Sequence, residues 1–181
     1  MENFFKLVSK RESCRKFNGR PVNREDLLKC VEAARLAPSA CNSQPWKFII
    51  VDDQGLKNEL CRAAFSAPYT ASWPEKAGAI LVVISERGSF TARVGNFVRD
   101  TRYYLVDIGI AVEHFILQAA ELGLGTCWMG WFNEKGVKQV LGLPAASKVD
   151  IIVPVGYAEN KEPRKKIRKS ITEICAFNKY Q

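Results

Sequence analysis

The stretch YYLVDIGIAVEHFILQAAEL, residues Tyr103–Leu122, decides the fold. Its apolar residues cover nearly all sides of a helix, and Gly123 after it suits a helix C-cap. Such a helix lies in the middle of a protein or at an oligomer interface. Neither it nor any other run approaches the about 18 apolar residues of a membrane span, so we expect no membrane partner. The residues that interrupt it are Asp107, Glu113, His114, Gln118 and Glu121.

Shorter segments on both sides predict further helices and strands. A short N-terminal helix is expected, with Lys6–Arg11 as its last part. Further helices are expected at Arg24–Leu36 (capped by Asn23), Leu56–Ala64 and Asn133–Leu141. Strands are expected at Lys47–Asp52, Ala79–Ser85 and Val149–Tyr157, with Gly125–Met129 a strand or a loop beside one. Pro154 should limit its strand to an edge or an end. Strands separated by helices predict a sheet covered by helices.

Length and composition indicate one domain over residues 1–181, of which 47% are hydrophobic. The N-terminus has no basic-then-apolar leader, which predicts a cytoplasmic protein with reduced thiols. No Cys-x-x-Cys pair occurs and there is one histidine, so no metal site is expected. The cysteines are Cys14, Cys30, Cys41, Cys61, Cys127 and Cys175.

The net charge of +8 is concentrated near the C-terminus, where Asn160–Lys169 holds six basic residues and one acid. A basic surplus favours anionic partners such as phosphorylated cofactors, nucleic acid or acidic membranes. The tail from residue 160 has too few apolar residues for a core of its own, so we expect it to dock onto another surface. Those residues are Ile167, Ile171, Ile174 and Phe177.

Two N-terminal patches could carry chemistry. In Arg11–Phe17, two arginines four residues apart with Ser13 between them can converge on a phosphate, although a solvated basic helix end is the simpler interpretation. In Ala37–Trp46, amide side chains in a turn suit the polar edge of a flavin or a base, unless this is an ordinary turn with a structural Trp46.

Two later patches are less specific. Small residues in Gly123–Gly130 let the main chain approach a flat ligand, but a helix cap followed by a core strand has the same pattern. Lys166 and Arg168 could add charge to the same phosphate or belong to a solvated tail. No P-loop or Rossmann fingerprint occurs, and His114 is expected to be a core histidine rather than a catalytic base.

In order, these patches resemble the nitroreductase family of FMN-dependent oxidoreductases over nearly the whole chain. Arg11–Phe17 resembles the family's Arg-Arg-Ser-x-Arg-x-Phe, and Ala37–Trp46 resembles its Ala-Pro-Ser-x-x-Asn-x-Gln-Pro-Trp. Asp107–Gly109 through Gly123–Trp128 resembles its central helix and Gly-Leu-Gly turn. Glu12 departs from the pattern, because a basic residue is usual there, and we expect its side chain to point away from the phosphate.

The resemblance implies a cofactor site for FMN and assigns no catalytic side chain. The residues implied for the phosphate and ribityl chain are Arg11, Ser13, Arg15, Lys166 and Arg168. Those implied for the ring, from the partner subunit, are Pro38, Ser39, Ala40 and Asn42, with Gln44 supporting the turn. The main chain near Met129 and Gly130 would approach flavin N5, and Trp128 is also implied as a cofactor-binding residue.

The same resemblance implies an α+β fold, a three-layer α/β/α sandwich with a mixed central sheet. It also implies a homodimer with FMN at the interface and a domain-swapped tail, residues 160–181, on the partner subunit. The implied reaction is ping-pong: NADH or NADPH passes a hydride to FMN, and a nitroaromatic, quinone or related small oxidant then accepts it. As a further hypothesis, Phe90 and Phe97 cover the substrate pocket, unless they belong to a mobile surface segment.

Two other functions fit some of these observations. The protein could bind FMN without turnover, as a redox sensor or flavin carrier, but no effector domain accompanies it. The basic tail could bind nucleic acid, but no recognition motif accompanies it, so we expect no nucleic-acid partner. No lid of the dehalogenating or flavin-cleaving relatives is recognisable, which disfavours those reactions.

Overall fold

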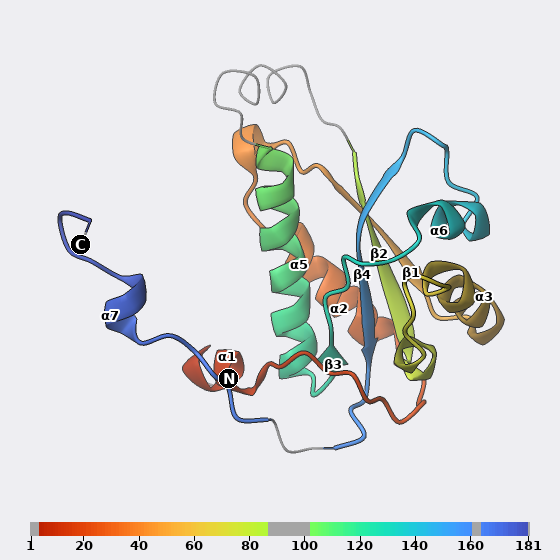
Figure 1. Cartoon of the computed structure of the whole chain (residues 1–181), viewed down its shortest axis with the longest axis horizontal. Coiled ribbons are helices and arrows are strands. Elements are labelled where there is room, and N and C mark those ends of the chain that lie inside the picture. The colour runs from red at the N-terminus through yellow and green to blue at the C-terminus, as the bar shows by residue number, and fades with distance from the viewer. Residues whose placement is uncertain (1–3, 87–101, 161–163, 181) are drawn as a thin grey trace.

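The computed structural model of the chain describes residues 4–86, 102–160 and 164–180. Within these ranges, helices cover both faces of one sheet (Figure 1). The helices are α1 (Phe4–Lys10), α2 (Arg24–Arg35), α3 (Gln54–Ala64), α5 (Tyr103–Glu121), α6 (Glu134–Val140) and α7 (Ile171–Ile174), with 3-10 turns η1 (Ala40–Asn42) and η2 (Trp73–Lys76). The strands are β1 (Trp46–Val51), β2 (Ala79–Ser85), β3 (Gly125–Thr126) and β4 (Lys148–Gly156).

The described sheet has the order β1-β2-β4-β3, and all of its strand pairs are antiparallel. The pair β1–β2 is antiparallel because α3 leaves the end of β1 and residues 65–78 return the chain to that same end. Among the described residues, parallel pairing occurs in an isolated bridge between Ser13 and Thr126. The expected mixed sheet is therefore corrected to an antiparallel sheet with one parallel bridge beside β3.

Pro154 lies near the C-terminal end of β4, which is an interior strand and not an edge. Its carbonyl accepts a hydrogen bond from Cys127 N at 3.3 Å, but a proline has no N–H to return one. Pairing resumes between Met129 and Ile152, whose N–H and C=O groups exchange bonds of 2.9 and 3.0 Å. Residues 125–129 therefore run beside β4 in one register, and the missing proline donor interrupts the ladder after Thr126.

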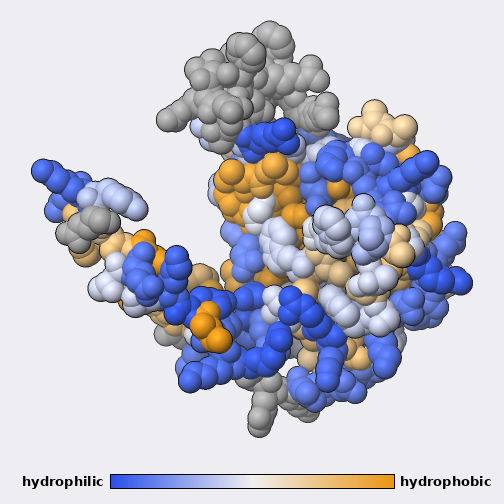
Figure 2. All heavy atoms as spheres, viewed as in Figure 1, coloured by the Kyte–Doolittle hydropathy of each residue, from blue (hydrophilic) through white to orange (hydrophobic). Residues whose placement is uncertain are grey.

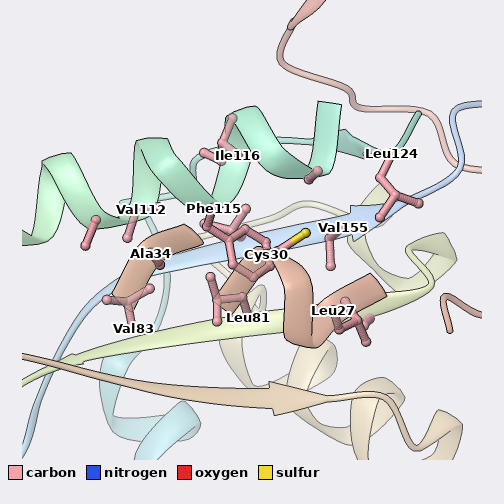
Figure 3. Close-up of a cluster of buried hydrophobic side chains, with 14 of the residues drawn as sticks. Leu27, Cys30, Ala34, Leu81, Val83, Val112, Phe115, Ile116, Leu124 and Val155 are labelled. Carbon is pink, nitrogen blue, oxygen red and sulfur yellow. The ribbon is translucent and has the colours of Figure 1, made fainter. Parts of the chain in front are cut away.

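Two clusters of buried apolar side chains pack the helices against the two faces of the sheet. One lies between the sheet and helices α2 and α5, and Figure 3 shows Cys30 of α2 beside Phe115 of α5; Leu27 of α2 belongs to the same cluster. The other lies on the opposite face, where α3 and α6 contribute the buried Leu60 and Val137. Burial of these side chains is the main stabilising contribution to the sandwich. The predicted three-layer α/β/α arrangement is therefore confirmed.

Helix ends follow local signals in the sequence. Asn23 Oδ1 accepts a hydrogen bond from Glu25 N at 3.0 Å, as expected of the N-cap of α2. Gly123 follows α5 with φ of +77°, a left-handed conformation that favours glycine. Asn133 caps α6 through a bond from Gly136 N at 3.2 Å.

The tail extends away from the layered body beyond α1 (Figures 1 and 2). Its apolar side chains are exposed, with Ile167 at 89% and Phe177 at 85%. These side chains add nothing to the two core clusters, as the sequence predicts. Docking of the tail onto a partner subunit stays a prediction.

The described residues include no helix with the length and apolar character needed to cross a bilayer. Nor do they bring together a metal-binding group of histidine, cysteine or acidic side chains. All the cysteines lie in the described ranges, and all are free thiols.

Candidate functional site

The basic tail contacts the segment that follows α1. Arg164 donates from its backbone N and from Nε to Glu12 Oε2, both at 3.1 Å, and from Nη2 to the Ser13 carbonyl at 2.6 Å. Two residues further on, Lys166 Nζ donates to the Val8 carbonyl at 2.5 Å. These bonds place the basic pair Lys166 and Arg168 beside the Arg11–Phe17 patch.

This contact gathers positive charge around Lys166. The pKa of Lys166 lies below its usual value because of burial and because Arg11 and Arg168 repel its charge. Two acids act on Lys166 in the opposite sense: Glu12, whose carboxylate is paired with Arg164, and Glu113 of α5. We name Arg11, Lys166 and Arg168 the cation cluster; an anion bound among them would relieve their mutual repulsion.

The turn after α5 lies next to the first patch. Cys14 N donates to the Thr126 carbonyl at 2.8 Å, beside the Ser13–Thr126 bridge. A Cβ on Gly125 would come within 2.7 Å of Cys14 Cβ, so only glycine allows this approach of the two segments. The Arg11–Phe17 patch and the Gly123–Gly130 patch therefore form one continuous surface.

Two cavities open along that surface. The larger, of about 370 Å³, is lined by Lys10, Arg11, Glu12, Cys14, Asn18, Arg20, Ala120, Gly123, Leu124, Gly125, Thr126, Tyr157, Ala158 and Asn160. The smaller, of about 230 Å³, is lined by Glu12, Cys14, Arg15, Lys16, Ala158, Asn160 and Arg164. Arg11 and Arg15 therefore face different cavities on either side of residues 12–14.

The segment Trp128–Gly130 continues from this surface. Met129 uses its N–H and C=O to bind Ile152, so it holds the loop against β4. Gly130 is exposed, and a Cβ there would meet no atom within 4 Å. Trp128 is 37% exposed. Of these three, Gly130 offers the open main chain that the sequence analysis assigns to this segment.

The second patch forms a tightly held turn around η1. Cys41, Asn42 and Gln44 all have positive φ, at 53°, 51° and 44°, which is rare for residues with a side chain. Ser39 Oγ accepts from Gln44 N at 2.9 Å, and Gln44 Nε2 donates to Asn42 Oδ1 at 3.2 Å. The predicted role of Gln44 as turn support is therefore confirmed. Such strain is typical of functional sites.

Within one chain, this turn lies beside the first half of α5, whereas the larger cavity, which Arg11 lines, lies at the other end of that helix. Ala40 N donates to Oδ1 of the buried Asp107, in the first half of α5, at 3.0 Å. The larger cavity instead reaches Ala120, at the C-terminal end of the same helix. About 20 Å of helix separates Asp107 from Ala120. The chain thus brings together Arg11, Lys166 and Arg168. Ser13 lies in the segment between the two cavities, and Arg15 faces the smaller one. Pro38, Ser39, Ala40 and Asn42 lie apart from them, at the turn that binds Asp107.

Four further residues bear on the sequence predictions. His114 Nδ1 lies 3.3 Å from the Ala33 carbonyl of α2, in a position that joins two helices. Phe90 and Phe97 lie outside the described residues. Arg164 is the contact that sequence reasoning missed. Its charge run was visible, but nothing in the run distinguishes which basic residue pairs with Glu12.

Comparison with known proteins identifies the family. The model of the nitroreductase family matches residues 8–157. The iodotyrosine deiodinase of Thermotoga neapolitana is 27% identical over 176 residues, covering 91% of this chain and 93% of that protein. The oxygen-insensitive NADPH nitroreductase of Helicobacter acinonychis is 27% identical over 194 residues, covering 90% of each.

A solved structure supports the same assignment. The FMN-dependent nitroreductase from Clostridium difficile R20291 superposes with a TM-score of 0.75 at 27% identity, covering 97% of this chain and 99% of that one. Sequence, architecture and the order of the patches agree, and on these findings the chain belongs to the nitroreductase family.

Proposed function

We propose that this chain is a cytoplasmic, homodimeric oxidoreductase that uses FMN to pass electrons from NADH or NADPH to small oxidants such as nitroaromatics and quinones. Membership of the nitroreductase family supports the cofactor and the electron donor. The observation that carries the proposal is the cation cluster of Arg11, Lys166 and Arg168, where the tail returns to the N-terminal segment.

The residues present fit FMN. Its phosphate is a dianion, and charge-assisted hydrogen bonds from guanidinium and ammonium groups are the strong ones in proteins. Arg11, Lys166 and Arg168 would hold that phosphate. Ser13, in the segment between the two cavities, and Arg15, at the smaller cavity, would contact the phosphate or the ribityl chain from there. The exposed backbone at Gly130 leaves room for a flat ring to approach. When bound, FMN supplies the two-electron hydride chemistry of the reaction.

Arg164 and Glu12 would hold the tail in place and reduce the unfavourable charge near the phosphate. The bonds of Arg164 to Glu12 and Ser13 hold the tail, and with it Lys166 and Arg168, over the phosphate position. The pairing of Glu12 with Arg164 reduces the repulsion between that carboxylate and the anion. His114 contacts the Ala33 carbonyl, so we assign it no proton transfer in the reaction.

In the proposed dimer, the Ala37–Trp46 patch of one chain contacts the flavin that the other chain binds by its phosphate. Members of the family are generally dimeric. Because α5 separates η1 from the cation cluster, one chain supplies the phosphate side of a site and lacks its own η1 turn there. We therefore assign Pro38, Ser39, Ala40 and Asn42 to the ring bound by the partner subunit.

Flavin retention tests the phosphate assignment. We expect the double variant Arg11→Ala/Arg168→Ala to lose FMN during purification while its far-UV circular dichroism and sedimentation stay those of a folded dimer. The double variant Arg62→Ala/Lys76→Ala removes the same charge from the α3–η2 region and should keep its yellow colour. Full retention of FMN by the first variant would contradict the assignment.

Anaerobic mixing with each nicotinamide separates an enzyme from a flavin sensor or carrier. An enzyme's flavin absorbance bleaches with NADH or NADPH and returns when a quinone is added. A yellow protein that bleaches with neither donor is not the proposed enzyme.

A further inference from the structure

Asp107 is a carboxylate among the buried side chains of α5. It is 5% exposed, and its neighbours on the buried face, Ile108 and Ala111, are apolar and fully buried. A buried carboxylate is costly unless hydrogen bonds replace those that it made with water. The bond that the structure shows comes from 67 residues earlier in the chain, where Ala40 N donates to Asp107 Oδ1 at 3.0 Å. What this acid holds therefore explains its place better than the packing of the helix does.

The bond from Ala40 fixes one peptide group of the η1 turn at both ends. The N–H of that group donates to Asp107, and its C=O, which belongs to Ser39, accepts from Asn42 N at 3.0 Å. The Ser39 hydroxyl also accepts a hydrogen bond, from Gln44 N at 2.9 Å. The orientation of a single peptide plane therefore determines how Ser39 and Asn42 lie in the turn.

The turn needs support from outside because its backbone conformation is unfavourable. Cys41, Asn42 and Gln44 have φ of 53°, 51° and 44°, in the left-handed region that residues with a Cβ rarely adopt. Residues in such conformations persist only where the surrounding structure imposes them. Bonds inside the turn join its residues to one another, whereas the bond to Asp107 joins the turn to the central helix. Loss of that bond should therefore let the turn relax toward other conformations.

We propose that Asp107 is a positioning residue for the flavin ring. Its carboxylate holds the Ala40 N–H, and through that peptide group it sets the places of Ser39 and Asn42. The inference rests on the proposed function, in which the η1 turn of one chain contacts the FMN whose phosphate the partner subunit binds. Asp107 of one chain therefore acts on the flavin of the other chain, and it transfers neither a proton nor an electron.

Hydrogen exchange tests the hold of Asp107 on the turn in the full-length protein without FMN. In Asp107→Ala, the amides of residues 40–44 should exchange about tenfold faster or more, because a hydrogen bond to a charged group is worth at least about that factor. Asp107→Asn keeps an acceptor oxygen and should stay within about threefold of wild type. Glu121→Ala is the matched control, because it removes an α5 carboxylate that bonds Gln118 instead of the turn.

Binding of two flavins separates the ring from the phosphate. The protein is titrated with FMN and with riboflavin, which lacks the phosphate, and binding is followed by flavin fluorescence. Asp107→Ala should raise the dissociation constants of both flavins by the same factor, about tenfold. Arg11→Ala/Arg168→Ala should raise the dissociation constant of FMN alone. Asp107→Asn should restore most of the affinity for both flavins.

A mixed dimer shows on which subunit Asp107 acts. One chain carries Asp107→Ala, and its partner carries Arg11→Ala/Arg168→Ala. Action across the interface leaves one site with an intact cation cluster and an intact turn, so one FMN per dimer should bind with wild-type affinity. Action within a chain damages both sites, so a mixed dimer without a wild-type site would overturn the proposal.

The outcomes distinguish this inference from the proposed function. A wild type that binds no FMN overturns the proposed function, and with it the role of Asp107 toward the flavin. If wild type binds FMN but Asp107→Ala keeps the wild-type exchange of the turn or the wild-type flavin affinity, the inference alone is wrong. Asp107→Leu removes the same oxygen atoms without leaving a cavity, so the comparison can be made even where Asp107→Ala does not fold.

Discussion

Replacement of Arg164 by alanine should weaken FMN binding without touching the cation cluster directly. The substitution removes the Nε bond to Glu12 and the Nη2 bond to the Ser13 carbonyl, at 3.1 and 2.6 Å. The guanidinium is 64% exposed, so its ion pair contributes only about 0.2–1 kcal/mol. The bond to the carbonyl adds about 1 kcal/mol.

Together these bonds amount to about 1–2 kcal/mol, which corresponds to a roughly 5- to 30-fold higher dissociation constant. The physical reason is positional: without this anchor, Lys166 and Arg168 spend part of their time away from the phosphate. Titration of the apoprotein with FMN, followed by quenching of flavin fluorescence, measures the effect. Lys169→Ala is the matched control, because it removes one positive charge from the same tail and should change the constant less than twofold.

A double-mutant cycle distinguishes anchoring from direct contact with the phosphate. If Arg164 acts through Glu12, then Glu12→Ala also weakens FMN binding, and the double variant is little worse than Arg164→Ala alone. If Glu12 only repels the anion, its removal strengthens binding instead. An Arg164→Ala variant that binds FMN as tightly as wild type would refute the anchoring argument.

Two other predictions concern stability. Burial alone would raise the pKa of Glu134, but hydrogen bonds from Lys148, Lys138 and the Val149 N–H lower it to about 2. Because the folded-state pKa lies below the unfolded one, the stabilisation is fully present above about pH 4.5 and is lost as pH falls toward about 2. Glu134→Gln should therefore lower the free energy of urea unfolding by about 2 kcal/mol at pH 7, and by less at pH 3; an equal loss at both would contradict this. Phe115→Ala should lower the same quantity by about 3–5 kcal/mol, since the ring is fully buried, whereas Phe4→Ala, at a side chain 63% exposed, should change it by less than about 0.5 kcal/mol.

Local signals were sufficient for most of the fold. The Asn23 cap, the apolar run of α5 and the β-branched run of β2 each identify their element within a residue or two. Strand pairing is different, because it depends on how connections cross the sheet. The antiparallel order and the interior place of β4 in the sheet therefore could not be predicted from the residues alone, although Pro154 does lie near the end of its strand, which is one of the two expected positions.

The candidate site, too, could be predicted from the sequence only in part. The motifs that contain Ser13 and Asn42 are continuous in sequence and could be identified there. The pairing of Glu12 with Arg164 spans 152 residues, and any of several basic residues in the tail could have made it. The distance between η1 and the cation cluster also depends on the whole of α5, which local patterns do not reveal.

The bridge between Ser13 and Thr126 has a consequence for the solubility of the chain. An outer strand with unpaired N–H and C=O groups is a template onto which other chains can add, which leads to aggregation. Here the N-terminal segment covers the outer side of β3 through that bridge and the Cys14 N–H bond. Removal of the residues up to Cys14 would expose this edge of β3. The short segment that carries the basic motif therefore also prevents the sheet edge from pairing with other chains.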